Sequence, residues 1–183
     1  MSRCAQKGRK TMPARFRIRG IMGGCLAVIM ASSHLADAEP LYRLWLGRDG
    51  DHFYTTNLNE AFNATRLGYV FEGDAGECDL GASATTTPLY RLYSPSGADH
   101  FYTADWRERD LAISAHGYEL EGVACWVRSS QEPGTCPLYR MYSGQQQDHF
   151  YTLSWNEVLY AASVGYAYEG IAAYMSSPDG CPE

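Results

Sequence analysis

The sequence predicts a mainly β fold made of three tandem repeats, each of which contains one short helix. The pentapeptide Asp-His-Phe-Tyr-Thr occurs at residues 51–55, 99–103 and 148–152. Each copy follows a Pro-Leu-Tyr-Arg segment and precedes a Gly-Tyr-x-x-Glu-Gly segment. A fixed period of this size, roughly 48 residues, indicates one supersecondary unit whose copies bury each other's apolar faces. We therefore divide the chain into repeats 40–87, 88–136 and 137–183.

Each repeat is expected to begin with a β-hairpin and to continue into a capped helix. Pro-Leu-Tyr-Arg joins a first-position proline to β-forming residues, and His-Phe-Tyr-Thr supplies the second strand after a polar, glycine-containing link. A capping box is predicted in every copy, because a glutamate stands three positions after each N-cap residue. The N-cap residues are Asn57, Asp105 and Ser154, the glutamates are Glu60, Glu108 and Glu157, and Gly68, Gly117 and Gly165 end the helices.

A third and a fourth strand are expected after each helix, which gives a β-β-α-β-β unit. The third covers residues 68–73, 117–122 and 165–170, and the fourth covers 123–127 and 171–175. In repeat one a cysteine-containing and then polar segment follows, so its fourth strand is expected to be displaced or missing. Closing three such units around a pseudo-threefold axis would remove exposed sheet edges. We predict a β-trefoil-like barrel, with a small propeller-like ring as the alternative.

Residues 1–38 have the pattern of a secretory signal peptide. Seven basic residues precede an apolar run from Gly20 to Met30, and Ala36-Asp37-Ala38 fits the cleavage rule. A membrane anchor fits less well, because the run is shorter than the ~20 residues of a span. We expect a secreted protein, extracellular or periplasmic, whose single domain covers residues 39–183.

Charge and cysteine content narrow the class of protein further. Residues 39–183 hold eight arginines, no lysine and twenty acidic residues, a formal charge of −12. Such a surface repels phosphate backbones and anionic lipids, so we expect no nucleic-acid partner and no membrane association after signal removal. Four cysteines in a secreted chain predict two disulfides. Equivalent positions before proline favour Cys136–Cys181, which leaves Cys78–Cys125, and no spacing typical of a zinc site occurs.

The repeated Asp-His pairs are the first candidates for chemistry. Three imidazoles that met on an axis would suit zinc, and each Asp-His could serve as a general base. A structural role in every copy is the simpler interpretation, so we assign no catalytic residue, no metal and no cofactor. The ligand-binding hypothesis adds nearby aromatic residues to these pairs, and its members are Asp51, His52, Tyr54, Asp99, His100, Tyr102, Trp106, Asp148, His149, Tyr151 and Trp155.

A second repeated set consists of arginines and glutamates. Strand alternation places each arginine of Pro-Leu-Tyr-Arg on a face with apolar neighbours, where an unpaired charge is costly. The glutamate of Gly-Tyr-x-x-Glu-Gly is the expected bidentate partner. The predicted structural ion pairs are Arg43–Glu72, Arg91–Glu121 and Arg140–Glu169.

The order of these motifs resembles an uncharacterised repeat family of secreted bacterial and fungal proteins, known as a domain of unknown function. The resemblance covers all three repeats and implies an accessory module of the kind attached to secreted hydrolases, with no catalytic residues to carry over. Repeat one departs from the pattern at Leu58 and around Cys78.

The leading functional hypothesis is a secreted, non-catalytic, lectin-like module that recognises carbohydrate or a cell-wall polymer. An acidic domain rich in tyrosine and tryptophan suits neutral glycans. The nucleophile-elbow, zinc-protease and phosphate-loop motifs are missing from the sequence. A small secreted hydrolase that uses carboxylates or the Asp-His pairs is one alternative, and a protein-interaction or inhibitor module is another.

Overall fold

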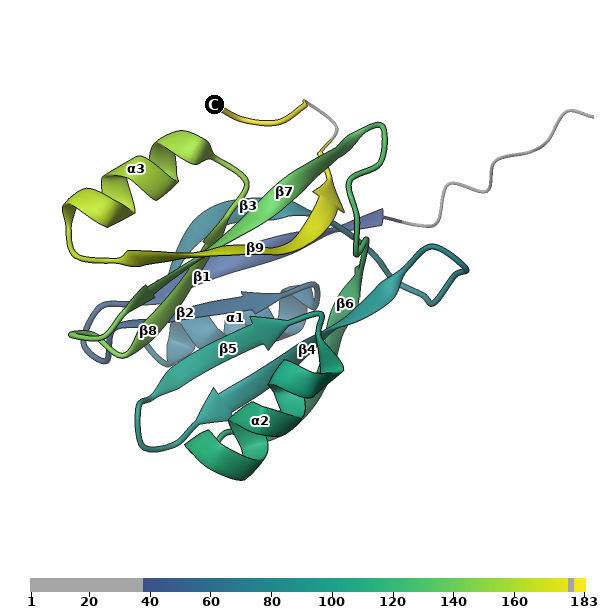
Figure 1. Cartoon of the computed structure of the whole chain (residues 1–183). Helices are drawn as coiled ribbons and strands as arrows, with labels where there is room; N and C mark the ends of the chain where they lie inside the picture. Colours follow the sequence, from purple (N-terminus) through teal and green to yellow (C-terminus); the bar gives the residue numbers. More distant parts are fainter. Residues whose placement is uncertain (1–37, 178–179) are drawn as a thin grey trace, which may run out of the picture. The chain divides into compact units, whose positions relative to one another are not determined.

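Each repeat folds as a β-hairpin, a short helix and one long strand (Figure 1). The computed structural model describes residues 38–177 and 180–183. The predicted signal peptide lies outside the described residues, except for Ala38 at the start of β1. Among the described helices, none has the length and apolar character needed to cross a membrane.

The three repeats contain the same elements in the same order. Repeat one consists of β1 (Ala38–Leu46), β2 (Asp51–Thr55), α1 (Leu58–Arg66) and β3 (Val70–Asp79). Repeat two consists of β4 (Thr87–Ser94), β5 (Asp99–Thr103), α2 (Trp106–His116) and β6 (Glu119–Val127). Repeat three consists of β7 (Thr135–Ser143), β8 (Asp148–Thr152), α3 (Trp155–Ser163) and β9 (Ala167–Ser176).

The pentapeptide strands β2, β5 and β8 are the most buried elements of the fold. All five residues of each strand are buried. Each strand pairs antiparallel with the first strand of its own repeat, so Arg43 lies opposite Tyr54 and Arg91 opposite Tyr102. The first strand also pairs with the last one, which gives every repeat a three-stranded antiparallel sheet.

The helices begin at the predicted N-cap residues, but the capping box is incomplete. Asn57 accepts from the N–H groups of Asn59 and Glu60, Asp105 accepts from that of Arg107, and Ser154 accepts from that of Glu157. The backbone N–H of Asn57 donates to the hydroxyl of Thr55 at 3.0 Å rather than to Glu60. That hydroxyl donates to the Glu60 carboxylate, and the arrangement recurs in the other repeats. Each helix glutamate can therefore also bind a group from another repeat.

The predicted third and fourth strands are one continuous strand in each repeat, so the unit is β-β-α-β rather than β-β-α-β-β. The glycine of Glu-Gly lies opposite the repeated arginine, next to a shift in the pairing register. Gly73, Gly122 and Gly170 have φ angles of 125°, 135° and 123°, a conformation that glycine adopts without strain. The glycine therefore forms a bulge and does not end the strand. The same holds in repeat one, where β3 continues through Cys78 to Asp79.

The described strands form an open sheet, and the predicted closed, trefoil-like barrel is not found. They pair in the order β5-β4-β6-β3-β9-β7-β8, and β1 pairs with β2 and β3. Pairing between repeats is limited to single positions near the strand ends, such as Asp79 with Trp126 and Glu77 with Ser176. The repeats therefore associate mainly through side chains and not through a continuous backbone ladder.

Three tyrosines explain why the inner strands do not pair with each other. The hydroxyl of Tyr102 donates to the carbonyl of Tyr54 and accepts from its N–H, both at 2.8 Å. Tyr151 binds the backbone of Tyr102, and Tyr54 binds that of Tyr151, which completes a cycle. The hydroxyls thus occupy the backbone groups that a closing ladder would use. The rings lie edge to face, 5.3 to 5.5 Å apart, and form the centre of the core.

The four cysteines of the described region form the disulfides Cys78–Cys125 and Cys136–Cys181. The first joins β3 of repeat one to β6 of repeat two. The second joins β7 to the C-terminal residues of repeat three. This is the pairing that the sequence favours, and it fits a protein that folds in an oxidising compartment.

The tyrosine cycle generates a stability prediction. Tyr102→Phe removes a hydroxyl that bonds both backbone groups of Tyr54 and leaves them buried without a partner. We expect the free energy of unfolding to fall by about 1–3 kcal/mol, the usual cost of an unsatisfied buried polar group. Urea denaturation would measure the change. Tyr160→Phe is the control, because Tyr160 is exposed, and an equal loss in both variants would contradict the prediction.

Candidate ligand-binding site

The repeated arginines join adjacent repeats. Arg140 of repeat three forms two parallel hydrogen bonds, of 2.9 and 2.8 Å, with Glu108 of repeat two. Its Nε lies 2.8 Å from Glu169 of its own repeat. Its guanidinium stacks over Phe101 of repeat two at 5.1 Å. Arg91 makes the corresponding contacts with Glu60, Glu121 and Phe53. Arg43 makes them with Glu157, Glu72 and Phe150.

These pairs keep both partners charged although they are partly buried. Burial alone would lower the pKa of Arg140, but the carboxylates of Glu108 and Glu169 outweigh it and raise the pKa. Burial opposes ionisation of Glu108, yet hydrogen bonds from Arg140 and Thr103 lower the pKa of that carboxyl. The predicted partners Glu72, Glu121 and Glu169 each contact the Nε of the arginine in their own repeat. The bidentate pair of each arginine, however, forms with the helix glutamate of another repeat.

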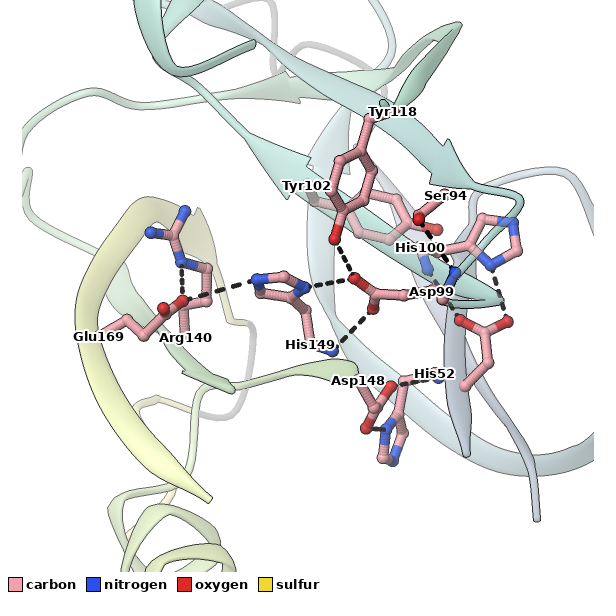
Figure 2. Close-up of polar contacts among 12 residues, drawn as sticks. His52, Ser94, Asp99, His100, Tyr102, Tyr118, Arg140, Asp148, His149 and Glu169 are labelled. Atoms are coloured by element: carbon pink, nitrogen blue, oxygen red, sulfur yellow. Dashed lines mark hydrogen bonds and ion pairs between the residues drawn. The ribbon is translucent and has the colours of Figure 1, made fainter. Parts of the chain in front are cut away.

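The Asp-His pairs also connect repeats, so each histidine binds the aspartate of another copy. The Nδ1 of His149 lies 2.6 Å from the Oδ2 of Asp99, and the His149 backbone N–H donates to its Oδ1 at 2.8 Å. The Tyr118 hydroxyl also donates to Asp99, at 2.5 Å. Figure 2 shows Asp99, His149, Glu169 and Arg140 following one another through such contacts, with 3.7 Å between His149 Nε2 and Glu169. At the interface of repeats one and two, His100 and Tyr69 bind Asp51 in the same way. At the interface of repeats three and one, His52 and Tyr166 bind Asp148.

The aspartates, and not the histidines, lie close to one another. In the described region, the one group of three potential metal ligands is Asp51, Asp99 and Asp148, with carboxylate oxygens within 4.8 Å. Each carboxylate already accepts from a backbone N–H, an imidazole and a tyrosine hydroxyl. These donors account for the burial of the charges, so the cluster is explained as a structural centre.

Several members of the ligand-binding hypothesis are inaccessible to a ligand. Tyr54, Tyr102 and Tyr151 are each 1% exposed, and Asp51, Asp99 and Asp148 are no more exposed than that. Each tyrosine hydroxyl and each aspartate carboxylate has its hydrogen bonds within the protein. Their repetition is explained by the core, where their polar groups are hydrogen-bonded, although Asp99 also borders the cavity described next.

The histidines are different, since one edge of His149 faces a cavity between repeats two and three. The cavity has a volume of about 460 Å³, within the range of small-molecule sites, roughly 300–1,000 Å³. One wall is the arginine-glutamate bridge, and the other is the β4–β5 loop with the end of α2. The lining residues are Ser94, Ser96, Gly97, Asp99, Phe101, Glu108, Leu111, Ala112, His116, Tyr118, Arg140, Tyr142, Gln147, His149 and Glu169.

A smaller cavity occupies the corresponding place between repeats three and one. It has a volume of about 180 Å³. Its walls contain the equivalent bridge of Arg43, Glu72 and Glu157, together with His52 and Phe150. Tyr160 and Val164 of α3 complete it.

The two candidate tryptophans do not line these cavities. Trp106 is 52% exposed, beneath the guanidinium of Arg107. Trp155 is 42% exposed and packs edge to face on Tyr139 and Tyr168. Both lie at the first turn of a helix and present part of the indole ring to solvent.

Sequence reasoning missed the second function of the helix glutamates and the tyrosine that follows the helix. Glu60, Glu108 and Glu157 were expected to cap helices, and Tyr69, Tyr118 and Tyr166 were treated as part of a strand. The available indication was their strict repetition in all three copies. No spacing within one repeat reveals a contact that is made between repeats.

The chain belongs to the family described as Domain of unknown function (DUF5648), whose sequence pattern matches residues 40–176. No curated protein and no solved structure shows significant similarity to the chain.

The arginine-glutamate bridge predicts a specific dependence of stability on pH. The pKa of Glu108 is lowered from 4.5 in the folded protein. Its contribution to stability is therefore complete above about pH 4.5 and is lost as the pH falls through the lowered folded-state value. We expect Glu108→Gln to be less stable than the parent protein at about pH 6, with a smaller difference at about pH 3.

Urea denaturation at several pH values would measure this difference. The exposed Glu119 provides the matched control, because Glu119→Gln removes a carboxylate without removing an arginine bridge. A destabilisation by Glu108→Gln that stayed constant between these pH values would contradict the prediction.

Proposed function

We propose that this protein is a secreted, non-catalytic, lectin-like module that binds neutral or amino sugars in the cavity between repeats two and three. The observation that carries the proposal is the cavity of about 460 Å³ next to fixed hydrogen-bonding groups and aromatic rings. We further propose that the three repeats surround a pseudo-threefold axis, so that related positions exist at each interface.

The chemistry of the cavity suits a ligand rich in hydrogen-bond donors. Glu108 and Glu169 supply carboxylate oxygens, and Ser94 and Ser96 supply hydroxyls. The imidazole of His149, whose Nδ1 lies 2.6 Å from Asp99, presents Nε2 as a further polar group near Glu169. Sugar hydroxyls or a sugar ammonium group match these acceptors. The ring of Tyr142 adds an aromatic face of the kind that packs against pyranose rings.

The polar groups are held in place before a ligand arrives. Arg140 fixes Glu108 and Glu169, and Asp99 fixes the imidazole of His149. Tyr142 lies against the same imidazole, with ring centroids 4.6 Å apart. Groups that are already ordered lose little conformational entropy on binding, which favours useful affinity from a small site.

Charge and compartment support the same class of ligand. Residues 39–183 carry a formal charge of −12, which disfavours uronic acids, sialic acids, nucleic acids and anionic membranes. The predicted signal peptide at residues 1–38 and the two disulfides support an extracellular or periplasmic location. An extracellular glycan or cell-wall polymer is the partner that this location provides.

A hydrolase is the second candidate, and one observation favours it. Buried Asp99 orients His149 so that Nε2 faces the cavity near Glu169, an arrangement that a general base requires. Release of reducing ends from the oligosaccharides used below would establish this activity. Binding without such release would support the lectin-like module.

The first experiment is binding of the purified protein to a panel of tetrasaccharides measured by calorimetry. The panel contains cellotetraose, chitotetraose, mannotetraose and the glucosamine tetramer, with a glucuronate-containing tetrasaccharide as the anionic control. We expect binding to at least one of the first four, and no binding to the control. Failure of a folded protein to bind any of the four would overturn the proposal.

A pair of equivalent variants locates the site. Glu169→Gln is expected to weaken binding about 10-fold, since loss of one charge-assisted hydrogen bond costs about 1.5 kcal/mol or more. Glu121→Gln is the matched control, because Glu121 makes the same contact with Arg91 at the interface of repeats one and two. Equal weakening by both variants would indicate a loss of structure and not of a ligand contact.

A further inference from the structure

We propose that the cavity between repeats two and three is the one strong sugar site of the chain, and that Gln146 and Tyr160 close the equivalent site between repeats three and one. The proposal rests on the proposed function. It specifies which interface between repeats can hold a sugar ring. It also identifies residues that determine acceptance and that differ between the repeats.

The wall made of repeated residues is the same at both interfaces. Arg140, Glu169 and His149 face the larger cavity, and Arg43, Glu72 and His52 face the smaller one. The side chains of His149 and His52 are each 11% exposed. The binding groups themselves therefore do not explain the difference between about 460 and 180 Å³.

The first difference lies in the hairpin loop. Counted back from the pentapeptide, Gly97 of repeat two corresponds to Gln146 of repeat three. Gly97 lines the larger cavity. Gln146 lies over Gly50, and its Oε1 accepts from the Tyr166 hydroxyl at 3.1 Å. Tyr118 and the equivalent Tyr166 border the larger and the smaller cavity. In the proposed arrangement, the Gln146 side chain takes up volume beside Tyr166 that Gly97 leaves free beside Tyr118.

The second difference lies on the helix. Leu111 of α2 and Tyr160 of α3 occupy equivalent positions, three residues after the bridging glutamate, and each borders its cavity. Tyr160 is larger than leucine and is 71% exposed, which places it at the mouth of the smaller cavity. Helix α2 is also longer than α3, with 11 residues against 9, and its last residue, His116, borders the larger cavity.

The interface of repeats one and two differs in a third way. Leu46 takes the place of Ser94, since both lie opposite the aspartate of the pentapeptide. The Leu46 side chain is 6% exposed and packs near Gly68. A buried leucine thus stands where the larger cavity is bordered by Ser94, whose hydroxyl accepts from the Gly97 N–H at 3.2 Å.

The consequence is a stoichiometry of one sugar per chain, although every repeat carries the same arginine, histidine and Glu-Gly glutamate. Avidity on a polymer would then require several chains on that polymer, because one chain offers one strong site. The identity of the loop and helix residues, and not of the repeated motif, would determine which copies bind.

Calorimetry with the four tetrasaccharides named above tests this inference, using whichever binds with the lowest Kd. The parent protein should bind one molecule. Gly97→Gln should raise the Kd at least 10-fold, and it needs little rearrangement, because the nearest atom to an added Cβ is the Ser94 hydroxyl at 3.3 Å. Asp49→Gln changes the equivalent position of repeat one and should leave the Kd unchanged.

The opposite change tests the closed site directly. Gln146→Gly combined with Tyr160→Leu should raise the stoichiometry from one to two, while Tyr166 keeps its hydrogen bond to Asp148. A parent stoichiometry of two or three, an unchanged Kd in Gly97→Gln, or a double variant that still binds one molecule would overturn the inference and leave the lectin-like function standing. Absence of binding to all four tetrasaccharides would overturn both.

Discussion

The buried aspartate of each pentapeptide is the group on which the arrangement of the repeats depends. A carboxylate that is at most 1% exposed is unfavourable unless donors replace water. One repeat supplies only part of what is needed, a tyrosine hydroxyl, and another repeat supplies an imidazole and a backbone N–H. In an isolated repeat, the buried aspartate would therefore lack the imidazole and backbone N–H donors that the other repeat provides. These contacts form a cycle among the three repeats. Each repeat donates hydrogen bonds to the aspartate of one neighbour and receives them at its own aspartate from the other.

The same division of contacts between repeats creates the candidate site. Arg140 of repeat three binds the helix glutamate Glu108 of repeat two and also Glu169 of repeat three. Both carboxylates are therefore fixed at the boundary between the two repeats. The imidazole is fixed there by the aspartate. The groups that face the cavity are thus ordered by the fold itself. A site of this kind needs few residues of its own, because the interactions that stabilise the interface also orient the groups that a ligand would contact.

Local features were predictable from the sequence, and contacts between repeats were not. Hairpins and N-caps depend on residues a few positions apart, and these were found where β-formers and Asn57, Asp105 and Ser154 indicated them. The glycine of Glu-Gly was interpreted as a strand boundary, although its positive φ serves a bulge in a continuous strand. The prediction of a closed barrel was wrong. The hydroxyls of Tyr54, Tyr102 and Tyr151 bind the backbone groups that a hydrogen-bonded ladder between the inner strands would need. Among the candidate ligand-binding residues, His149 and His52 border cavities, and the aspartates and inner tyrosines are buried in the core.

Repetition therefore has a different meaning in this chain from the one that it first suggests. A residue that occurs in all three copies is required three times by the packing between repeats, as Asp99 and Tyr102 illustrate. A residue that differs between copies is free of that requirement and can adapt one interface to a ligand. Gly97 and Leu111 are of this second kind, and they border the cavity of about 460 Å³ at a boundary whose other wall is built from repeated residues. In the proposed binding role, the repeated residues would supply the polar groups, and the residues that vary would decide whether space remains for a ligand beside them.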